Sequence, residues 1–476
     1  MTQARPRLPL IAVLLAATAL SACTTLPQSA PFAREPSQAK KDNPIAAVSV
    51  QSWWKGFGDA QLNSLMNQAL NNSPTLAIAE ARLNQSEAVV SQYHASAGPN
   101  IGLNATTFEG KQSYNYLFGH PGALSPLPEG YQDYAQATLN FGWDLDFWGK
   151  NRAAISAATT TAQAAAADAA QARLMLSAAV TSAYIDLDRL YQERDLAQRA
   201  VEIRQDSAGL VQHKLDNGVT NRGEFDLAQA NLYASKSDLA ALDEQIELNK
   251  HLIATLIGAS PDAAAQIQRP QLHPAQASFT GVPSRVNLDL IGRRPDIIAA
   301  RWRAEAASAR IQQAHAAFYP DINIAAFIGV QALHVDKLLQ NGSDIGQVGP
   351  ALSLPLFDGG ALKANLKSAE AGHAEAIASY NEDVLTAMHQ VADTLTSQRA
   401  LADRLDNAQK ALDADEEAYR LSKLRYDGGL SDYTTLLVAE QGLINQRRVV
   451  ADLKSRALSL DVALIKSLGG QYANPA

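Results

Sequence analysis

Cysteine, basic clusters and long apolar runs are scarce in this sequence of 476 residues. Cys23 is the only cysteine, so no disulfide can form within the chain. Beyond the first 22 residues no run of about 20 apolar residues occurs. This argues against membrane-spanning helices and leaves β-strands as the means of crossing a membrane. The formal net charge is −8, and no stripe of Lys and Arg could neutralise phosphates, which argues against a nucleic-acid partner.

Residues suited to catalysis or metal binding are not grouped. The nine histidines are scattered, and the sequence has no Cys/His cluster, glycine-rich phosphate loop or nucleophile elbow. His94 and His315 stand at duplicate positions just before Pro99 and Pro320. We interpret them as a repeated structural hydrogen bond at a helix–strand junction rather than a metal site. The sequence therefore predicts a protein that is not an enzyme and needs no cofactor.

The first residues have the pattern of a targeting segment. Basic residues precede an apolar stretch, Leu8–Leu20, that is too short to span a membrane as a helix. It ends in Leu20-Ser21-Ala22-Cys23, which resembles a lipoprotein cleavage site. We interpret residues 1–22 as a lipoprotein signal peptide and residues 23–52 as a lipid-anchored linker, with diacylglycerol and an N-acyl chain on Cys23. The alternative is a chance cysteine in an ordinary secretory leader. Thr24 fits export to the outer membrane of a Gram-negative bacterium, because lipoproteins retained in the inner membrane favour Asp there.

The remaining chain reads as two copies of one unit. With an offset of 221 residues, Ser73-Pro74 aligns with Arg294-Pro295; with an offset of 211, Asp216-Asn217-Gly218 aligns with Asp427-Gly428-Gly429. The change of offset falls in loops, where insertions are tolerated. We assign the first copy to residues 53–258, a linker to 259–285, the second copy to 286–469 and a tail to 470–476.

Each copy is predicted to contain helices too long for a compact domain. The first helix is expected from about Asp59 to Ala97, and a second from about Asn151 to Leu215. About 65 helical residues make a rod near 100 Å long. The returning helices have apolar residues at three- and four-residue spacing, which is typical of a coiled-coil seam: Leu239, Leu242, Ile246 and Ile253 in one copy, and Val450, Leu453, Ala457 and Leu464 in the other.

Four segments alternate apolar and polar residues as β-strands do, near 100–108, 134–147, 321–331 and 347–357. This pattern fits transmembrane barrel strands and equally a half-buried soluble sheet. Trp143, Phe147 and Trp148 fit an interfacial aromatic girdle or packing at a strand–helix junction. Four strands cannot close a barrel, so membrane insertion would require sharing between copies. Two copies would give eight strands and three copies twelve, and the pattern does not choose between them.

Several motifs resemble the TolC-like outer membrane factor lipoproteins, of the drug-efflux branch that includes NodT and fusaric-acid-resistance proteins. The resemblance covers nearly the whole mature chain and rests on the Cys23 leader and four segments: Trp53-Trp54-Lys55-Gly56-Phe57, Trp143 to Lys150, Arg293-Arg294-Pro295-Asp296-Ile297 and Phe357-Asp358-Gly359-Gly360. It implies a mainly helical fold with a small transmembrane β part. It also implies a homotrimer with a twelve-stranded barrel and a twelve-helix periplasmic tunnel. The implied function is a passive exit duct for drugs or toxic small molecules, and the implied partners are a periplasmic membrane-fusion adaptor and an inner-membrane efflux transporter.

The resemblance also assigns roles to residues at the two helix turns. The turns Gly218-Val219-Thr220 and Gly429-Leu430-Ser431 resemble the tips that contact the adaptor. Glu224 matches an acidic gate position with Asp226 beside it, and Tyr426 matches a tethering tyrosine. The chain departs from the family at Thr435 and Val438, where other members have carboxylates. Asp432 would either substitute for them or cap the following helix. Glu224 could equally be a solvated acid at a helix start.

Two rival functions fit parts of the pattern. The exit duct of a type I protein secretion system shares this fold, whereas the lipoprotein leader and the Arg-Arg-Pro-Asp segment favour drug efflux. A periplasmic coiled-coil lipoprotein without a pore would explain the long helices alone. It would give no trimer in detergent and no conductance in a bilayer.

Overall fold

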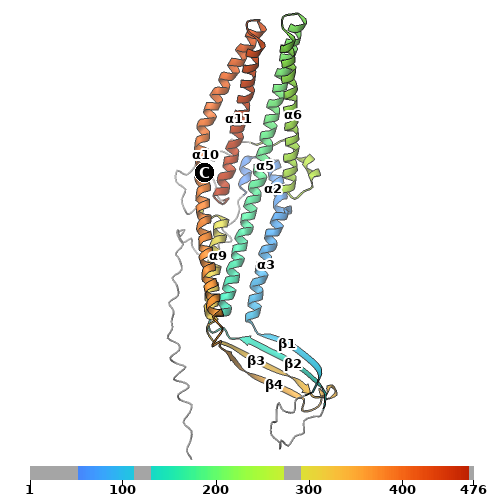
Figure 1. The fold of residues 1–476 in the computed structure, drawn as a ribbon, viewed down its shortest axis with the longest axis vertical. Helices are drawn as coiled ribbons and strands as arrows, with labels where there is room; N and C mark the ends of the chain where they lie inside the picture. Colours follow the sequence, from blue (N-terminus) through green and yellow to red (C-terminus); the bar gives the residue numbers. More distant parts are fainter. Residues whose placement is uncertain (1–51, 112–129, 273–290, 471–476) are drawn as a thin grey trace, which may run out of the picture.

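The computed structural model describes residues 52–111, 130–272 and 291–470. The predicted signal peptide, Cys23, most of the predicted 23–52 linker and part of the 259–285 linker lie outside these ranges. The described chain is elongated, with a sheet at one end and two helical hairpins at the other (Figure 1). Among the helices described, none combines the length and the apolar character needed to cross a bilayer.

Seven α-helices make up most of the described chain, with three short 3-10 helices between them. They are η3 (Trp53–Phe57), α2 (Ala60–Asn72), α3 (Pro74–Ala97), α5 (Lys150–Asp216), α6 (Arg222–Leu256), η4 (Pro261–Gln266), α9 (Pro295–Ala316), η5 (Val335–Lys337), α10 (Ala361–Asp427) and α11 (Tyr433–Ser467).

The single first helix expected from Asp59 to Ala97 is wrong, because the structure divides it into α2 and α3. Proline disfavours helical backbone in the residue before it, and Ser73 is accordingly extended ahead of Pro74. Pro74 then occupies the first turn of α3, where its missing N–H has no intrahelical partner to lose. At the start of α2, Asp59 Oδ1 accepts hydrogen bonds from the backbone N–H groups of Gln61 and Leu62.

The two copies have matching long helices. Both α5 and α10 have 67 residues, and both α6 and α11 have 35. The first and last residues of α10 and α11 each lie 211 residues after those of α5 and α6, as the offset read from the sequence predicts. In the sheet-proximal half the helices pack in the order α3, α5, α9, α10; in the other half the order is α6, α5, α11, α10 (Figure 1). The helix α5 therefore joins both halves at the centre of the layer.

Side-chain size explains how closely these helices pack. Near the sheet, α5 buries small residues, including Ala153, Ala154, Ala157 and Ala158, against its neighbours. At its midpoint a larger core forms where η3 and α2 lie against it, built around Phe57, Met66, Tyr184 and Ile253.

The four strands form one antiparallel sheet in the order β1-β2-β3-β4. The strands are β1 (Asn100–Gly110), β2 (Gln132–Asp144), β3 (Asp321–Ala332) and β4 (Asp344–Ser353). Two of them end earlier than expected. After β2, the Asp146 carboxylate accepts backbone hydrogen bonds from the first turn of α5. After β4, the Asp358 carboxylate accepts backbone hydrogen bonds from Gly360 and Leu362 at the start of α10.

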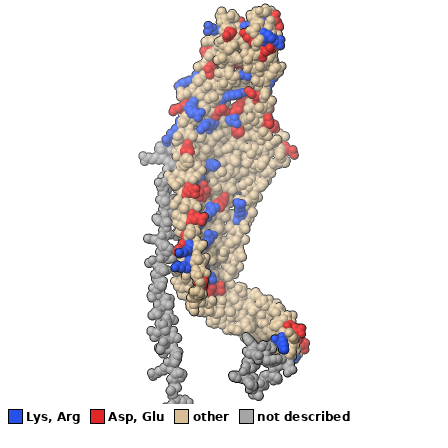
Figure 2. Space-filling model, viewed as in Figure 1, with Lys and Arg blue, Asp and Glu red and all other residues tan. Residues whose placement is uncertain are grey.

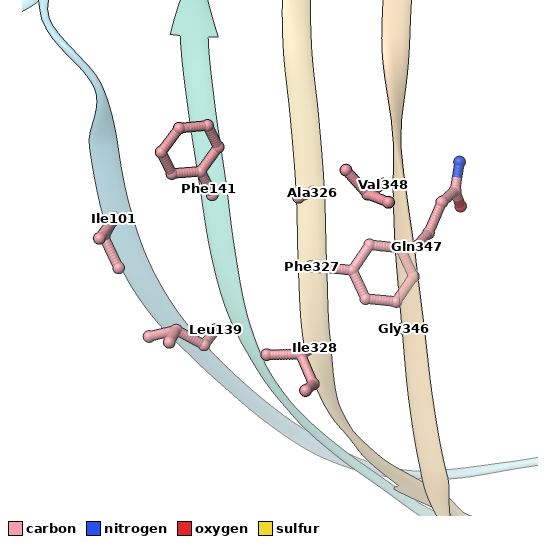
Figure 3. A pocket seen from close by; sticks show the side chains of 9 residues that line it. All are labelled: Ile101, Leu139, Phe141, Ala326, Phe327, Ile328, Gly346, Gln347 and Val348. Atoms are coloured by element: carbon pink, nitrogen blue, oxygen red, sulfur yellow. The ribbon is translucent and has the colours of Figure 1, made fainter.

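One face of the sheet is apolar, and no other part of the described chain covers it. In the register, Ile101, Phe141, Ala326 and Val348 form one cross-strand row. Ile101 is 68% exposed and Val348 is 78% exposed. These residues line a shallow apolar groove, together with Leu139 and Ile328, across all four strands (Figure 3). Figure 2 shows the visible face of the sheet free of charged side chains except at its outer end.

The aromatic residues at the sheet–helix junction are expected either to form an interfacial girdle or to pack at the junction. Trp148 packs at the junction: its Nε1 donates to the Pro320 carbonyl at 2.9 Å, and its ring stacks on Tyr319. All three side chains, Trp143, Phe147 and Trp148, keep large exposed fractions, so the packing of Trp148 is at the surface of the junction. The hydrogen bond expected at the duplicated histidines is not found within the described chain. His315 instead packs against the ring of Tyr319, with 5.7 Å between centroids.

Candidate functional site: the helix tips

The two tip turns have the same backbone geometry. Gly218 and Gly429 both adopt positive φ, of 71° and 73°. In each turn the next residue donates its N–H to the fifth residue back, Val219 to Lys214 O and Leu430 to Arg425 O, both at 2.8 Å. This is the hydrogen-bond pattern with which a helix ends at a left-handed glycine. Val219 and Leu430 are then left at the ends of the hairpins, both mostly exposed.

A polar side chain caps the helix after each turn. Asn221 Oδ1 accepts from the backbone N–H of Glu224 at 3.1 Å. Asp432 Oδ1 accepts from the backbone N–H and the hydroxyl of Thr435, at 2.8 and 2.6 Å. The Thr435 hydroxyl and N–H hold the pKa of Asp432 below its usual value. The capping interpretation of Asp432 therefore has direct geometric support, since both contacts lie within its own first turn.

The two acidic residues of the first tip have different surroundings. Glu224 is half-buried, and its Oε2 accepts a hydrogen bond from the Thr220 hydroxyl. Asp226 is exposed and pairs with Arg222, with 3.1 Å between Nε and Oδ1. Arg222 thus offsets the charge of Asp226, and Glu224 is the acid without a cationic partner within the described chain.

Tyr426 is buried between the two hairpins. The Lys214 ammonium donates to the Tyr426 carbonyl at 2.8 Å and lies 3.5 Å from its ring centroid. The ring of Tyr433 packs beside it, at 5.8 Å between centroids. Burial, and then the nearby Glu224 charge, raise the pKa of Tyr426. Its hydroxyl has no hydrogen-bond partner in the described part of the chain, so Tyr426 is linked to α5 through its carbonyl and ring face.

A buried ion pair below the tips was missed by the sequence analysis. Arg204 on α5 and Glu440 on α11 lie with Nε and Oε1 3.3 Å apart, and Glu440 has no exposed surface. The guanidinium also donates to the Asn231 carbonyl and the Ser235 hydroxyl on α6, and to Gln441 Oε1 on α11. Ser207 donates to the second Glu440 oxygen at 3.2 Å. Burial raises the pKa of Glu440, and Arg204 and Ser207 oppose that shift.

A local signal for this pair did exist. Glu440 lies four residues after Leu436 and three before Leu443, and both leucines are buried. That spacing places Glu440 on the coiled-coil seam, where a carboxylate is tolerated only with a buried partner. The partner could not be read locally, because Arg204 is 236 residues away in sequence.

The described residues contain no group of three or more His, Cys, Asp or Glu side chains placed to hold a metal ion. A layer of paired helices that joins an apolar sheet with two open edges is the architecture expected of an outer-membrane channel protein.

Comparison with known proteins identifies the family. Residues 65–259 and 289–470 match the outer membrane efflux protein family, and the chain belongs to it. The chain is 31% identical over 477 residues to the multidrug resistance outer membrane protein MdtP of Shigella flexneri, covering 98% of this chain and 97% of that one. It is 34% identical over 331 residues to the fusaric acid resistance protein FusA of Burkholderia cepacia, covering 69% and 61%.

Solved structures agree with the fold. The outer membrane protein VceC from Vibrio cholerae superposes with a TM-score of 0.81 at 42% identity, covering 88% of this chain and 99% of that one. The expected fold class, function and location are therefore confirmed: the protein is a mainly helical efflux channel of the outer membrane. The family and its structural neighbours are channels rather than enzymes.

Proposed function

We propose that three copies of this chain form a passive exit duct of a tripartite efflux pump, without catalysis. The observation that carries this proposal is the uncovered apolar sheet with unpaired outer edges on β1 and β4. Unpaired backbone groups cannot face lipid, so the sheet needs further copies to close it. Three copies give twelve strands, and their helices give a twelve-helix tunnel in the periplasm.

Two further elements of the proposal concern attachment and partners. A diacylglycerol and N-acyl lipid on Cys23 would supplement the anchoring by the barrel. The exposed turns at Val219 and Leu430 would meet a periplasmic membrane-fusion adaptor, which links the duct to an inner-membrane efflux transporter. Matches named for multidrug resistance and fusaric acid resistance support small molecules as cargo, rather than secreted proteins.

The tips would also close the resting duct. Three copies would bring three Glu224 side chains toward one axis, with the Arg222–Asp226 pairs beside them. The Lys214–Tyr426 contact would hold the two hairpins of each copy together, and Asp432 would keep the start of α11 in place as its cap. A carboxylate ring in a narrow aperture attracts cations and repels anions. This arrangement is supported by the surroundings of Glu224, which is partly buried and has no cationic partner within the described chain.

The proposal is tested with full-length protein purified in detergent. Native mass spectrometry should give a trimer with lipid on Cys23, and planar-bilayer recordings should show discrete, cation-preferring steps. Glu224→Gln should reduce the cation preference, whereas the matched amide variant at the paired acid, Asp226→Asn, should change it less. A monomer, or a trimer without conductance, would favour the coiled-coil lipoprotein without a pore.

A further inference from the structure

A groove crosses the Ala-rich part of the helical layer, close to the sheet. It has a volume of about 340 Å³, and residues of α3 and α9 form its walls on either side of α5. Two of the described residues that line it are arginines, Arg82 on α3 and Arg310 on α9, and none of them is acidic. A volume of this size falls within the range typical of small-molecule sites. The groove is therefore large enough for an organic molecule, and its lining is positively charged.

Neither arginine of the groove has a counter-charge within the described chain. Both side chains are exposed, and no hydrogen bond or ion pair among the described residues involves them. Arg303, about two turns before Arg310 on α9, is instead paired with Asp168 on α5. A guanidinium without a partner offers parallel N–H donors, which match the two oxygens of a carboxylate. Arg82 and Arg310 are thus available to an anion that enters the groove.

The floor and one wall of the groove are apolar. Ala154, Ala157 and Ala158 supply the floor, and their small side chains leave the space above α5 open. Val89 and Tyr93 on α3 stand at the wall, and both keep exposed surface. Apolar and aromatic surfaces bind the body of a ligand, while a few polar groups fix its orientation. The lining therefore suits a molecule that joins one carboxylate to an apolar, preferably aromatic, body.

The groove opens on the face of the layer opposite to the one that α2 covers. Tyr184 marks the covered face, because its hydroxyl donates to Asp59 just before α2. Arg173 lies about three turns before Tyr184 and so shares this face, where it pairs with Glu80 on α3. Arg82 follows Glu80 by two residues, about 200° around α3, and therefore points to the opposite face. In a tube of copies α2 must lie outside, since inside it would fill the passage, so the groove faces the lumen.

We propose that this groove is a binding site for organic anions, molecules with a carboxylate on an aromatic or other apolar body, as they pass along the duct. The inference rests on the proposed function, in which the face opposite α2 lines the lumen. The carboxylate binds the guanidinium groups of Arg82 and Arg310, and the apolar body lies on the alanine floor beside Tyr93. Because the groove is open to water, binding is weak and reversible, and it weakens further as salt screens the charges. Each copy contributes one such site at the sheet end of the tunnel.

Calorimetric titration of the full-length protein in a non-ionic detergent tests the site, with naphthoate as the probe and uncharged naphthamide for comparison. Wild-type protein should bind naphthoate more tightly than naphthamide, with an affinity that falls as salt is added. Arg310→Gln should weaken naphthoate binding by about tenfold, because a hydrogen bond to a charged group contributes at least that factor. Arg301→Gln is the matched control, since it removes the same charge from the opposite side of α9. It should change the affinity by less than about twofold, because solvent screens a charge at that distance.

A second measurement tests whether the groove faces the lumen. Naphthoate should lower the current through wild-type channels in a planar bilayer and leave the current through channels with both Arg82→Gln and Arg310→Gln unchanged. Circular dichroism and native mass spectrometry check that each variant folds and assembles as wild type does. Equal affinity of wild type and Arg310→Gln for naphthoate, or binding that leaves the wild-type current unchanged, overturns the inference. Wild-type protein that neither forms trimers nor conducts refutes the proposed function instead, since the groove lies within one copy and its binding of naphthoate can still be measured.

Discussion

The two helical hairpins of this chain have the same backbone geometry and differ in the side chains at the start of their returning helices. The pairs α5/α6 and α10/α11 have equal lengths, glycines with positive φ at the same turn position, and a capping residue at the same place. At matching positions of the returning helices, the first hairpin has exposed Arg222 where the second has buried Tyr433. It has partly buried Phe225 where the second has fully packed Leu436.

This difference shows which features a duplication preserves. Helix length and turn chemistry recur, because any change would shift the tips relative to each other and misalign the layer. Seam residues are free to diverge, since each pairs with a neighbour and not with its own counterpart. The seam between α5 and α11 is held by the buried ion pair Arg204–Glu440. At the positions related to that pair by 211 residues, the chain has Asp415 and Gln229. The predictions below test whether that asymmetry has energetic consequences.

The largest expected effect comes from breaking the buried Arg204–Glu440 pair on one side only. Glu440→Leu leaves the Arg204 cation buried without its counter-charge, and should destabilise each copy by about 3–5 kcal/mol. Adding Arg204→Met should restore most of that loss, because two apolar side chains fill the site without a charge. Thermal melts followed by circular dichroism in detergent measure both. A double variant no more stable than Glu440→Leu would contradict the account.

The next effect depends on pH and separates Asp461 from its counterpart in the first copy, Lys250. Burial raises the pKa of Asp461 to about 7, and a hydrogen bond from Gln398 opposes the shift. A carboxyl with a raised pKa stabilises the folded chain while neutral, so that stability is full below about pH 4 and lost as pH rises toward 7. The full shift would correspond to roughly 4 kcal/mol per copy, and solvent screening at this partly exposed carboxyl reduces the expected effect well below that value.

Asp461→Asn should abolish this pH dependence and be more stable than wild type at pH 8, with little difference at pH 4. Lys250→Met is the matched control, because Lys250 pairs with Glu247 and stays charged throughout this range. Melting temperatures at several pH values measure the effect. Parallel wild-type and Asp461→Asn curves would show that the carboxyl is solvated.

A smaller effect compares the two caps. Asn221→Ala should weaken the start of α6 by about 1 kcal/mol, and Asp432→Ala should weaken the start of α11 in the same direction. Only the Asp432 cap titrates. Because its pKa is lowered in the folded chain, its stabilisation is present above the ordinary pKa and lost as pH falls through the folded value. Hydrogen exchange of tip peptides should therefore increase at α11 alone on acidification. Equal changes at both caps would refute the assignment.

The smallest effect is expected at Tyr426. Its hydroxyl has no partner in the described chain, so Tyr426→Phe should leave stability and conductance nearly unchanged. Lys214→Met removes the bond to the Tyr426 carbonyl and should favour opening, by about 1 kcal/mol per copy. Single-channel recordings compare the two variants. A leaky Tyr426→Phe channel would mean that the hydroxyl bonds to another copy in the trimer.

The sequence predicted features that depend on local chemistry. Residue alternation located all four strands, and the glycines located both turns. The break at Pro74 was missed because helical periodicity continues on both sides of it. The Arg204–Glu440 pair was missed for a different reason. Glu440 interrupts an apolar seam within seven residues, which is visible locally, whereas its partner belongs to the other copy and is found only when the helices are packed.

The most direct measurement of the account compares cross-links across the two seams. In an Arg204→Met background, which removes the uncompensated cation, Ser207→Cys with Glu440→Cys places thiols between α5 and α11 of one copy. Ala418→Cys with Gln229→Cys places them on α10 and α6, at the positions related by 211 residues, which meet between copies in the proposed trimer. With a short thiol cross-linker, the first pair should link within one copy, and the second should join copies into dimers and trimers on a denaturing gel. Assembled, conducting protein in which the second pair never joins copies would contradict the proposed ring of three copies.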